Sequence, residues 1–168
     1  QADVDFFAQL FGDGTGVNTN WRDIITRTGN QQQYNLSVSG GDTKNQFYMS
    51  GGYFNQQATV IASDFKRYSF RTNYKHTASD KLNFTVNLTG SNAIQNSPNN
   101  GGAFSNPVGT LPFLRPTQNP YNADGSLNIS TDPNDPTAFN SGNYNPLYIS
   151  LYDKYNTNTT LIQGSVGA

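Results

Sequence analysis

Apolar and polar residues alternate along four segments of the chain between residues 32 and 94. Beginning at Tyr34, every second residue is apolar until a turn rich in Gly and Asp at 40–45, and the pattern resumes directly after it. Two further segments, 64–76 and 81–93, keep the alternation for about twelve residues each. A two-residue period is typical of a strand with one apolar face. We therefore predict four antiparallel strands over 32–94.

The two faces of these predicted strands differ in chemistry. In the third strand one face is aromatic, whereas the other carries Arg67, Arg71, Asn73 and Lys75. The corresponding face of the fourth strand is uncharged and includes the amides Asn83 and Asn87. A polar face of amides and hydroxyls is expected for the aqueous interior of a barrel. We expect these six side chains to face that interior: Arg67, Arg71, Asn73, Lys75, Asn83 and Asn87.

The rest of the chain has less regular patterning. Residues 1–31 are predicted to be an irregular lead-in with short helical turns, one of them near 20–25. Residues 95–157 are rich in Asn, Pro and Gly and predict a long loop. Alternation restarts in 158–168, which predicts the beginning of another strand.

Strand length and turn length favour an outer-membrane barrel over a soluble β-sandwich. The predicted strands are longer than the usual five to six residues or so, and short turns alternate with long connections as they do in such barrels. No apolar run reaches the roughly 18 residues of a membrane-spanning helix. Closed barrel walls take about eight strands or more, so we expect an all-β, partial barrel of four to five strands belonging to a larger protein. Its long connection is expected to be extracellular.

Composition narrows the classes of function. Ten basic and eleven acidic residues give a net charge of −1, which argues against nucleic-acid binding because phosphate neutralisation needs clustered cations. The acidic residues are all Asp, and Cys is absent. The chain starts at Gln1 without an initiator Met or an apolar leader, so we expect any signal sequence to lie outside it.

Several blocks, taken in order, resemble the SusC/RagA-type TonB-dependent outer-membrane transporters of Bacteroidetes. A looser likeness continues through NPYNADGS at 119–126, and Gln57-Ala58 departs from the Glu-Gly pair common in the family. The blocks that carry the resemblance are NTNWRDIITRTG at 18–29, YNLSVSGG at 34–41, YMSGGYFNQ at 48–56, SDFKRYSFRTN at 63–73 and ASDKL at 78–82.

This resemblance implies properties that the residue pattern does not establish. It implies a 22-stranded barrel in outer-membrane lipid, an internal plug domain, a SusD-like surface lipoprotein as a lid, and import of oligosaccharides or peptides driven by the TonB complex. The plug and the segment that contacts TonB would lie outside this chain. No cofactor or metal is implied.

The long loop carries the candidate substrate-binding residues. Aromatic rings can stack on sugars or line a peptide groove, and Arg can bind a carboxylate. Alternatively, the prolines stiffen the loop and its aromatics pack on each other or on the lid. The candidates are Phe104, Phe113, Arg115, Tyr121, Phe139, Tyr144 and Tyr148.

Catalysis is not expected, and the remaining motifs are weak. His76 is the only His, which leaves little material for a catalytic triad or a His-based metal site. Residues 122–128 superficially resemble a calcium loop but lack its closing Glu, so an Asp-Gly turn is the preferred interpretation there, and a turn is also preferred at 132–136. The sequence thus favours part of an energy-coupled importer, with a soluble β-sandwich binding module or adhesin as the alternative.

Overall fold

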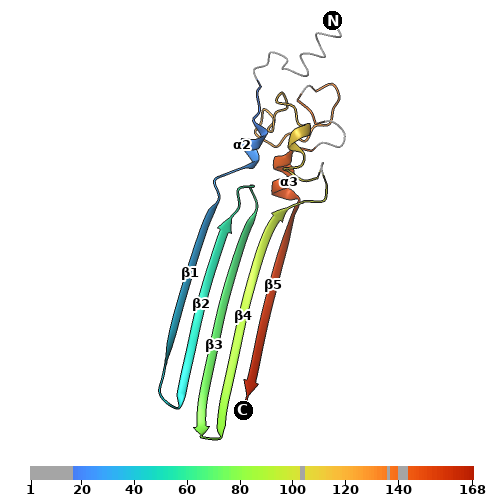
Figure 1. Ribbon diagram of the computed structural model, residues 1–168. Helices are drawn as coiled ribbons and strands as arrows, with labels where there is room; N and C mark the ends of the chain where they lie inside the picture. The colour runs from blue at the N-terminus through green and yellow to red at the C-terminus, as the bar shows by residue number, and fades with distance from the viewer. Residues whose placement is uncertain (1–16, 103–104, 136, 140–143) are drawn as a thin grey trace. The chain divides into compact units, whose positions relative to one another are not determined.

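The chain forms two compact units. The computed structural model describes residues 17–102, 105–135, 137–139 and 144–168 (Figure 1). One unit, the sheet unit, comprises residues 29–57, 64–96 and 156–168. The other, the connection unit, comprises the described residues of 17–28, 58–63 and 97–155.

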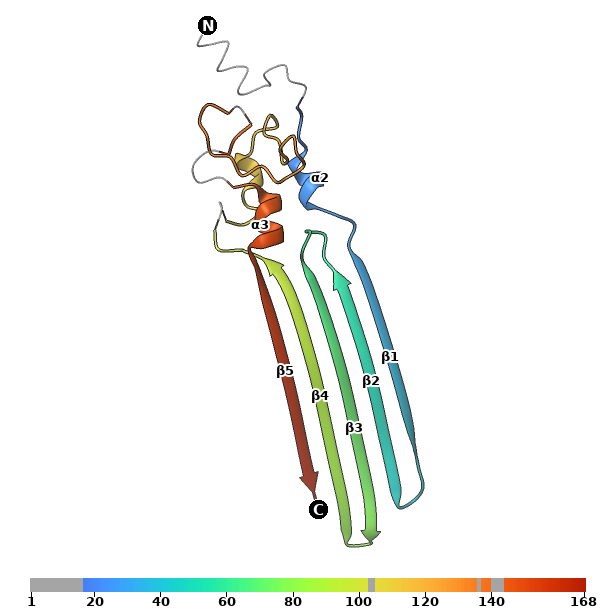
Figure 2. The ribbon, with the colours of Figure 1, turned by 180° about the vertical axis from the view of Figure 1, so that it is seen from behind.

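Five long strands make up an open sheet. Its order, β1-β2-β3-β4-β5, follows the sequence, and the arrows in Figures 1 and 2 alternate in direction. With 12 to 17 residues each, the strands are two to three times longer than typical globular strands of about five to six residues. Their bounds are Asn30–Gly41 (β1), Asn45–Gln57 (β2), Asp64–Ser79 (β3), Leu82–Pro98 (β4) and Lys154–Gly167 (β5).

The strand register sorts side chains onto two faces. Directly opposed residues of neighbouring strands lie on the same side of a sheet, and Val38 opposes Met49, which opposes Thr72, which opposes Leu88. On the other side Ser50 opposes Arg71, which opposes Thr89. We call these the apolar face and the polar face.

The apolar face is open to solvent in this chain. Leu36 is 80% exposed and Val166 79% exposed, although both are aliphatic. Among the described residues no second sheet covers this face, because all five strands belong to one sheet. Within the described residues the apolar rows are thus not buried between two sheets, as the rows of a β-sandwich would be.

Two short turns join the strands at one end of the sheet, which we call the turn end. In the first, Asp42 accepts hydrogen bonds from the backbone N–H groups of Lys44 and Asn45, both at 2.7 Å. In the second, an extra residue between Thr77 and Ser79 makes a β-bulge before the turn to Leu82. Asp is favoured in such turns because its side chain satisfies nearby backbone donors.

The connection unit has a small core and little regular structure. Helix α2 (Trp21–Ile25) lies where the sequence predicts a helical turn; η1 is Leu111–Phe113 and α3 is Pro146–Tyr152. Trp21, Ile25 and Phe139 are at most 5% exposed, and the Trp21 and Phe139 rings meet edge to face at 5.7 Å. Among the described residues no helix combines the length and hydropathy that crossing a membrane requires.

In this unit buried side-chain amides, rather than pairing between strands, satisfy many backbone hydrogen-bonding groups. Gln118 donates to the carbonyl of Ala138 at 2.9 Å and accepts from the N–H of Arg115 at 2.8 Å. The Asn145 amide donates to two carbonyls, and its oxygen accepts from Leu147 N–H at 3.0 Å, which caps α3. Such side chains satisfy the backbone groups of an irregular segment that would otherwise be buried without partners.

An arginine ties residues 58–63 to the lead-in segment. Arg27 donates to the carbonyl oxygens of Ala58 and Ser63, each at 3.1 Å. The Ala58 N–H also bonds to the Ser63 carbonyl at 3.0 Å, and Ala62 has a φ of 58°. The unusual Gln57-Ala58 pair therefore ends β2 and begins a defined connection.

The structure moves some predicted boundaries. Strand β4 continues to Pro98, and β5 begins at Lys154, so the long connection is 99–153 rather than 95–157. Likewise β1 begins at Asn30, inside the predicted lead-in of 1–31. Polar residues at the strand ends weaken the alternation, which is why the pattern underestimates the strands.

Candidate functional site

The apolar face carries aromatic rows near both ends of a nonpolar band. Toward the end opposite the turns, the Tyr34, Tyr53 and Tyr68 rings form a row with centroid distances of 6.4 and 5.2 Å. Toward the turn end Phe47 opposes Tyr74. Aromatic girdles that bound an apolar band are typical of outer-membrane strands, whose rings lie at the membrane interfaces.

Polar groups lie beyond both aromatic rows. At the turn end Asn45 accepts hydrogen bonds from the Tyr74 hydroxyl at 2.9 Å and lies 2.8 Å from a His76 ring nitrogen. At the opposite end Lys66 lies beyond the tyrosine row on the same side of β3, and the Asn96 amide donates a hydrogen bond to Asp64 at 2.9 Å. The sequence assigned no role to His76. In the structure it is one of the polar residues beyond the aromatic row at the turn end.

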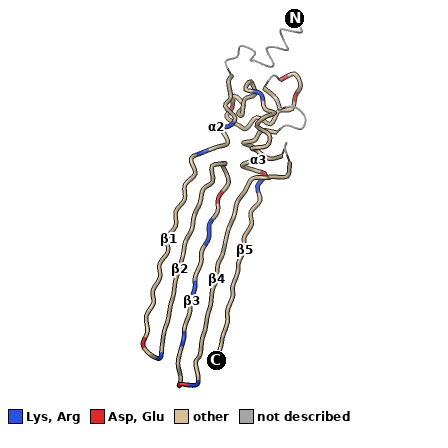
Figure 3. The backbone as a smooth tube through the Cα atoms, viewed as in Figure 1, with Lys and Arg blue, Asp and Glu red and all other residues tan. Residues whose placement is uncertain are grey.

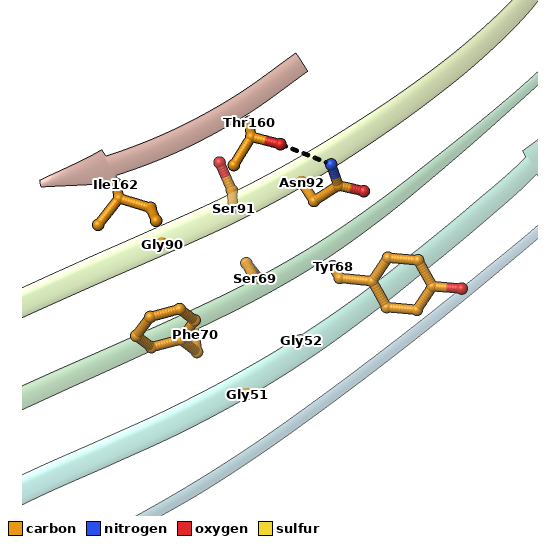
Figure 4. A pocket seen from close by; sticks show the side chains of 10 residues that line it. All are labelled: Gly51, Gly52, Tyr68, Ser69, Phe70, Gly90, Ser91, Asn92, Thr160 and Ile162. Carbon is orange, nitrogen blue, oxygen red and sulfur yellow. Dashed lines mark hydrogen bonds between the residues drawn. The ribbon is translucent and has the colours of Figure 1, made fainter. Parts of the chain in front are cut away.

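A hollow of about 420 Å³ lies at the middle of the sheet (Figure 4). Gly51 and Gly90 flank Phe70 in the same cross-strand row, and neither carries a side chain. The Phe70 ring lies against Gly90, so a side chain there would overlap the ring, whereas nothing lies within 4 Å of the corresponding position at Gly51. Ile162 of β5 lines the same hollow.

The polar face carries its charges on one strand. Arg67, Arg71 and Lys75 are all exposed on β3, the strand on which basic positions recur along the tube in Figure 3. The Arg67 guanidinium lies 5.7 Å from the centroid of the Phe54 ring, and Arg71 Nε donates to Asn73 at 3.3 Å. The register puts all six residues predicted to face the barrel interior on this face: Arg67, Arg71, Asn73, Lys75, Asn83 and Asn87.

Three candidate substrate-binding residues share a pocket in the connection unit. Phe139, Tyr144 and Tyr148 line a cavity of about 240 Å³. Phe139 is 1% exposed and acts as a wall fixed in the core, whereas Tyr144 and Tyr148 are 54% and 40% exposed. Two half-exposed aromatic rings beside an apolar wall suit a sugar ring or an apolar side chain.

Ile129, Thr131 and Asn145 complete the pocket and were not among the predicted residues. The Asn145 amide is already committed to backbone partners, which leaves Thr131 and the tyrosines to offer hydroxyls. The signal for Asn145 was present in the sequence, because Asn directly before Pro is a common helix start.

The other candidates do not line this pocket. Phe113 ends η1 and is 51% exposed, and Tyr121 is 45% exposed beside the turn at 122–126. The backbone of Arg115 bonds to Trp21 and Gln118, while its Nε atom is buried and has no hydrogen-bond partner among the described residues. Phe104 lies outside the described residues.

The acidic motif at 122–128 forms a turn. Asp124 accepts bonds from the N–H and the hydroxyl of Ser126 at 2.9 and 2.7 Å, and Gly125 has a φ of 84°. The hydroxyl bond to Ser126, followed by its backbone bond, lowers the pKa of Asp124. In the motif at 132–136, Asp135 similarly accepts from the Thr137 hydroxyl at 2.7 Å, which lowers the pKa of Asp135.

No family model matches the chain, but individual proteins do. The sequence is 28% identical over 120 residues to TonB-dependent receptor P3 of Formosa agariphila, covering 68% of this chain and 12% of that protein. It is 33% identical over 116 residues to TonB-dependent receptor P26 of the same organism, covering 68% and 11%. It is 29% identical over 127 residues to TonB-dependent receptor SusC of Bacteroides thetaiotaomicron, covering 70% and 12%.

The chain is related to SusC/RagA-type TonB-dependent transporters. Among solved structures, the RagAB peptide importer in a "closed-closed" state matches 73% of this chain with a TM-score of 0.53 and 25% identity, over 15% of its own chain. A second RagAB peptide transporter structure, at 23% identity, shares the fold over 90% of this chain with a TM-score of 0.61, over 17% of its own. The chain thus spans about a tenth of the length of its curated SusC-type relatives.

Proposed function

We propose that this chain is part of the wall of an outer-membrane importer for oligosaccharides or peptides, powered through TonB and working with a SusD-like surface lipoprotein. In this proposal the apolar face contacts lipid, the polar face lines the aqueous interior, and the connection unit lies outside the cell. The import step makes and breaks no covalent bond in the cargo.

One observation carries the proposal: strands of 12 to 17 residues present a continuous exposed apolar face on one side and amides, hydroxyls and a few cations on the other. Exposing such a face to water is unfavourable, whereas contact with lipid acyl chains would stabilise it, because removing apolar surface from water gains about 25 cal/mol per Å². The names of the relatives point to uptake, and the substrate class belongs to this proposal.

The connection unit supplies the proposed contact with cargo or lid. The pocket between Tyr144 and Tyr148 presents exposed rings and hydroxyls, which suit a sugar or a peptide side chain. The same exposed rings would suit the underside of a lipoprotein lid. Replacing both tyrosines by Ala distinguishes these uses, because loss of cargo binding and loss of lipoprotein association are separate readouts.

The test uses the full-length protein in its own outer membrane. We expect detergent-dependent extraction, co-purification of a lipidated surface protein, and growth on one class of oligosaccharide or peptide that disappears when either this gene or TonB is deleted. Defined oligosaccharides and peptides supplied singly identify the class. Recovery of the protein as a soluble particle, or unchanged growth in both deletion strains, contradicts the proposal.

A further inference from the structure

The cations of the polar face form a column along one strand. Arg67, Arg71 and Lys75 are spaced four residues apart on β3, which places successive charges about 14 Å apart, since an antiparallel strand rises about 3.4 Å per residue. The column therefore follows the strand from near the end opposite the turns toward the turn end. In Figure 3 the middle of the neighbouring strands carries no comparable charge.

No carboxylate of the described sheet neutralises this column. The chain contains no Glu, and Asp64 is the only Asp on a described strand, where it lies on the other face and bonds to Asn96. The residues directly opposite the cations are Phe54 and Ala93 for Arg67, Ser50 and Thr89 for Arg71, and Gln46 and Thr85 for Lys75. Side chains that offer no negative charge thus surround three exposed cations.

The polar face also has room for a ligand beside Lys75, the cation nearest the turn end. A hollow of about 360 Å³ beside Lys75 is lined on this face by Gln46, Tyr48, Asn73, Thr85 and Asn87. Amide and hydroxyl groups there can bind the hydroxyl or carbonyl groups of a chain-like molecule, while the ammonium group binds an anionic one.

We propose that this column guides a linear oligomer bearing carboxylate groups along the polar face. The inference rests on the proposed function and names the charge of its cargo. A fixed protein partner would need its carboxylates at set positions along the strand. Evenly spaced cations among side chains that carry no negative charge instead suit a ligand that moves past them. Each cation then releases one carboxylate as the next one binds it.

The test compares charged and neutral oligomers of equal length with the full-length protein in detergent. The probes are hexagalacturonate and its methyl ester, and hexaglutamate and hexaglutamine, so that the two pairs separate a uronic-acid saccharide from an acidic peptide. We expect one charged probe to bind at least about tenfold more tightly than its neutral counterpart at low salt, since hydrogen bonds to charged groups are the stronger ones. That preference should shrink in 0.5 M NaCl or thereabouts.

The variant R67Q/R71Q/K75Q should lose the preference while still binding the neutral probe. The matched control K44Q/K66Q/K81Q removes as many cations from the turns and from the other face, and it should keep the preference. No preference in the unmodified protein, or an unchanged preference in the first variant, overturns the inference while leaving outer-membrane uptake intact.

Two further outcomes are informative. Greater protease sensitivity of the first variant, with no change in probe preference, assigns the cations to contacts with another part of the polypeptide and also overturns the inference. Failure of the unmodified protein to fractionate with the outer membrane instead refutes the proposed function, and the two failures are therefore distinguishable.

Discussion

At the scale of single residues, two glycines of one cross-strand row have opposite surroundings. Gly90 lies beneath the Phe70 ring, whereas Gly51 opens onto free space. A side chain at Gly90 must displace the ring, while one at Gly51 only restricts the unfolded chain. The pair therefore separates a requirement for space from the general cost of glycine in a strand.

We predict that Gly90→Ala lowers the free energy of unfolding by about 1–3 kcal/mol, the usual range for overpacking. Gly51→Ala should be neutral or stabilising by up to about 1 kcal/mol. The full-length protein in lipid vesicles is heated to a series of temperatures and then run on a gel without boiling. The measurement is the temperature at which the band with native mobility disappears. Equal losses in both variants would contradict the assignment of Phe70 to Gly90.

A second residue-scale prediction concerns pH. Backbone hydrogen bonds from Asn45 and Lys44 lower the pKa of Asp42 below its ordinary value of 3.8. A lowered carboxyl pKa means that its stabilisation of the turn is present above 3.8 and is lost as the pH falls through the folded-state pKa. Hydrogen-exchange protection of residues 40–47 should therefore fall below that pH.

Asp42→Asn supplies the control for this effect. The amide keeps an acceptor oxygen but does not titrate, so the protection of residues 40–47 should become insensitive to acid. Identical acid sensitivity in the variant and the unmodified protein would show that another group governs the turn.

At the scale of elements, the strands test which face meets lipid. Leu36 and Ser37 are neighbours on β1 but lie on opposite faces. Leu36→Arg should destabilise the membrane-inserted protein by about 2–4 kcal/mol, the cost of an Arg at the middle of the bilayer. Ser37→Arg should cost much less because its side chain would lie in water. The fraction folded in vesicles over a urea titration gives both values, and a reversed order would exchange the two faces.

Helix α3 depends on the residue before it. Asn145→Ala removes two amide bonds to carbonyls and the helix cap, so we expect a loss of about 2–4 kcal/mol in the local stability of the connection unit. Limited proteolysis of the full-length protein should show faster cleavage within 99–153. Asn134→Ala, at an exposed amide of the same unit, should change this rate little.

The strands were predictable because their signal is local, and the connection unit was not. The alternation of Tyr34, Leu36 and Val38 with polar residues can be read from adjacent positions in the sequence. The strand register confirms that the three share one face. Gln118 instead acts through carbonyl and N–H groups that the fold brings to it, and no periodicity marks such a residue. The same reason explains the candidate site: the aromatics were visible as types, but their grouping depends on long-range packing.

At the scale of the whole molecule, each unit has its own basis of stability. The sheet unit is held by backbone ladders and leaves its apolar face to be covered by its surroundings. The connection unit buries Trp21, Ile25 and Phe139 and satisfies its backbone through buried amides. Changes in one unit should therefore be separable from changes in the other, and the glycine and amide variants above exploit this.

The two ends of the long connection, residues 99 and 153, are bonded to each other, and this bears on the order in which the strands pair. Strands β1 to β4 pair through short links, but β5 reaches β4 only after residues 99–153 have been traversed. The Asn99 N–H bonds to the Asp153 carbonyl at 2.9 Å, and its amide bonds to the Asp153 carboxylate at 2.7 Å. Since closing a long loop is entropically costly, we expect this clasp to bring β5 beside β4 already aligned, so folding of residues 99–153 should precede pairing of the fifth strand.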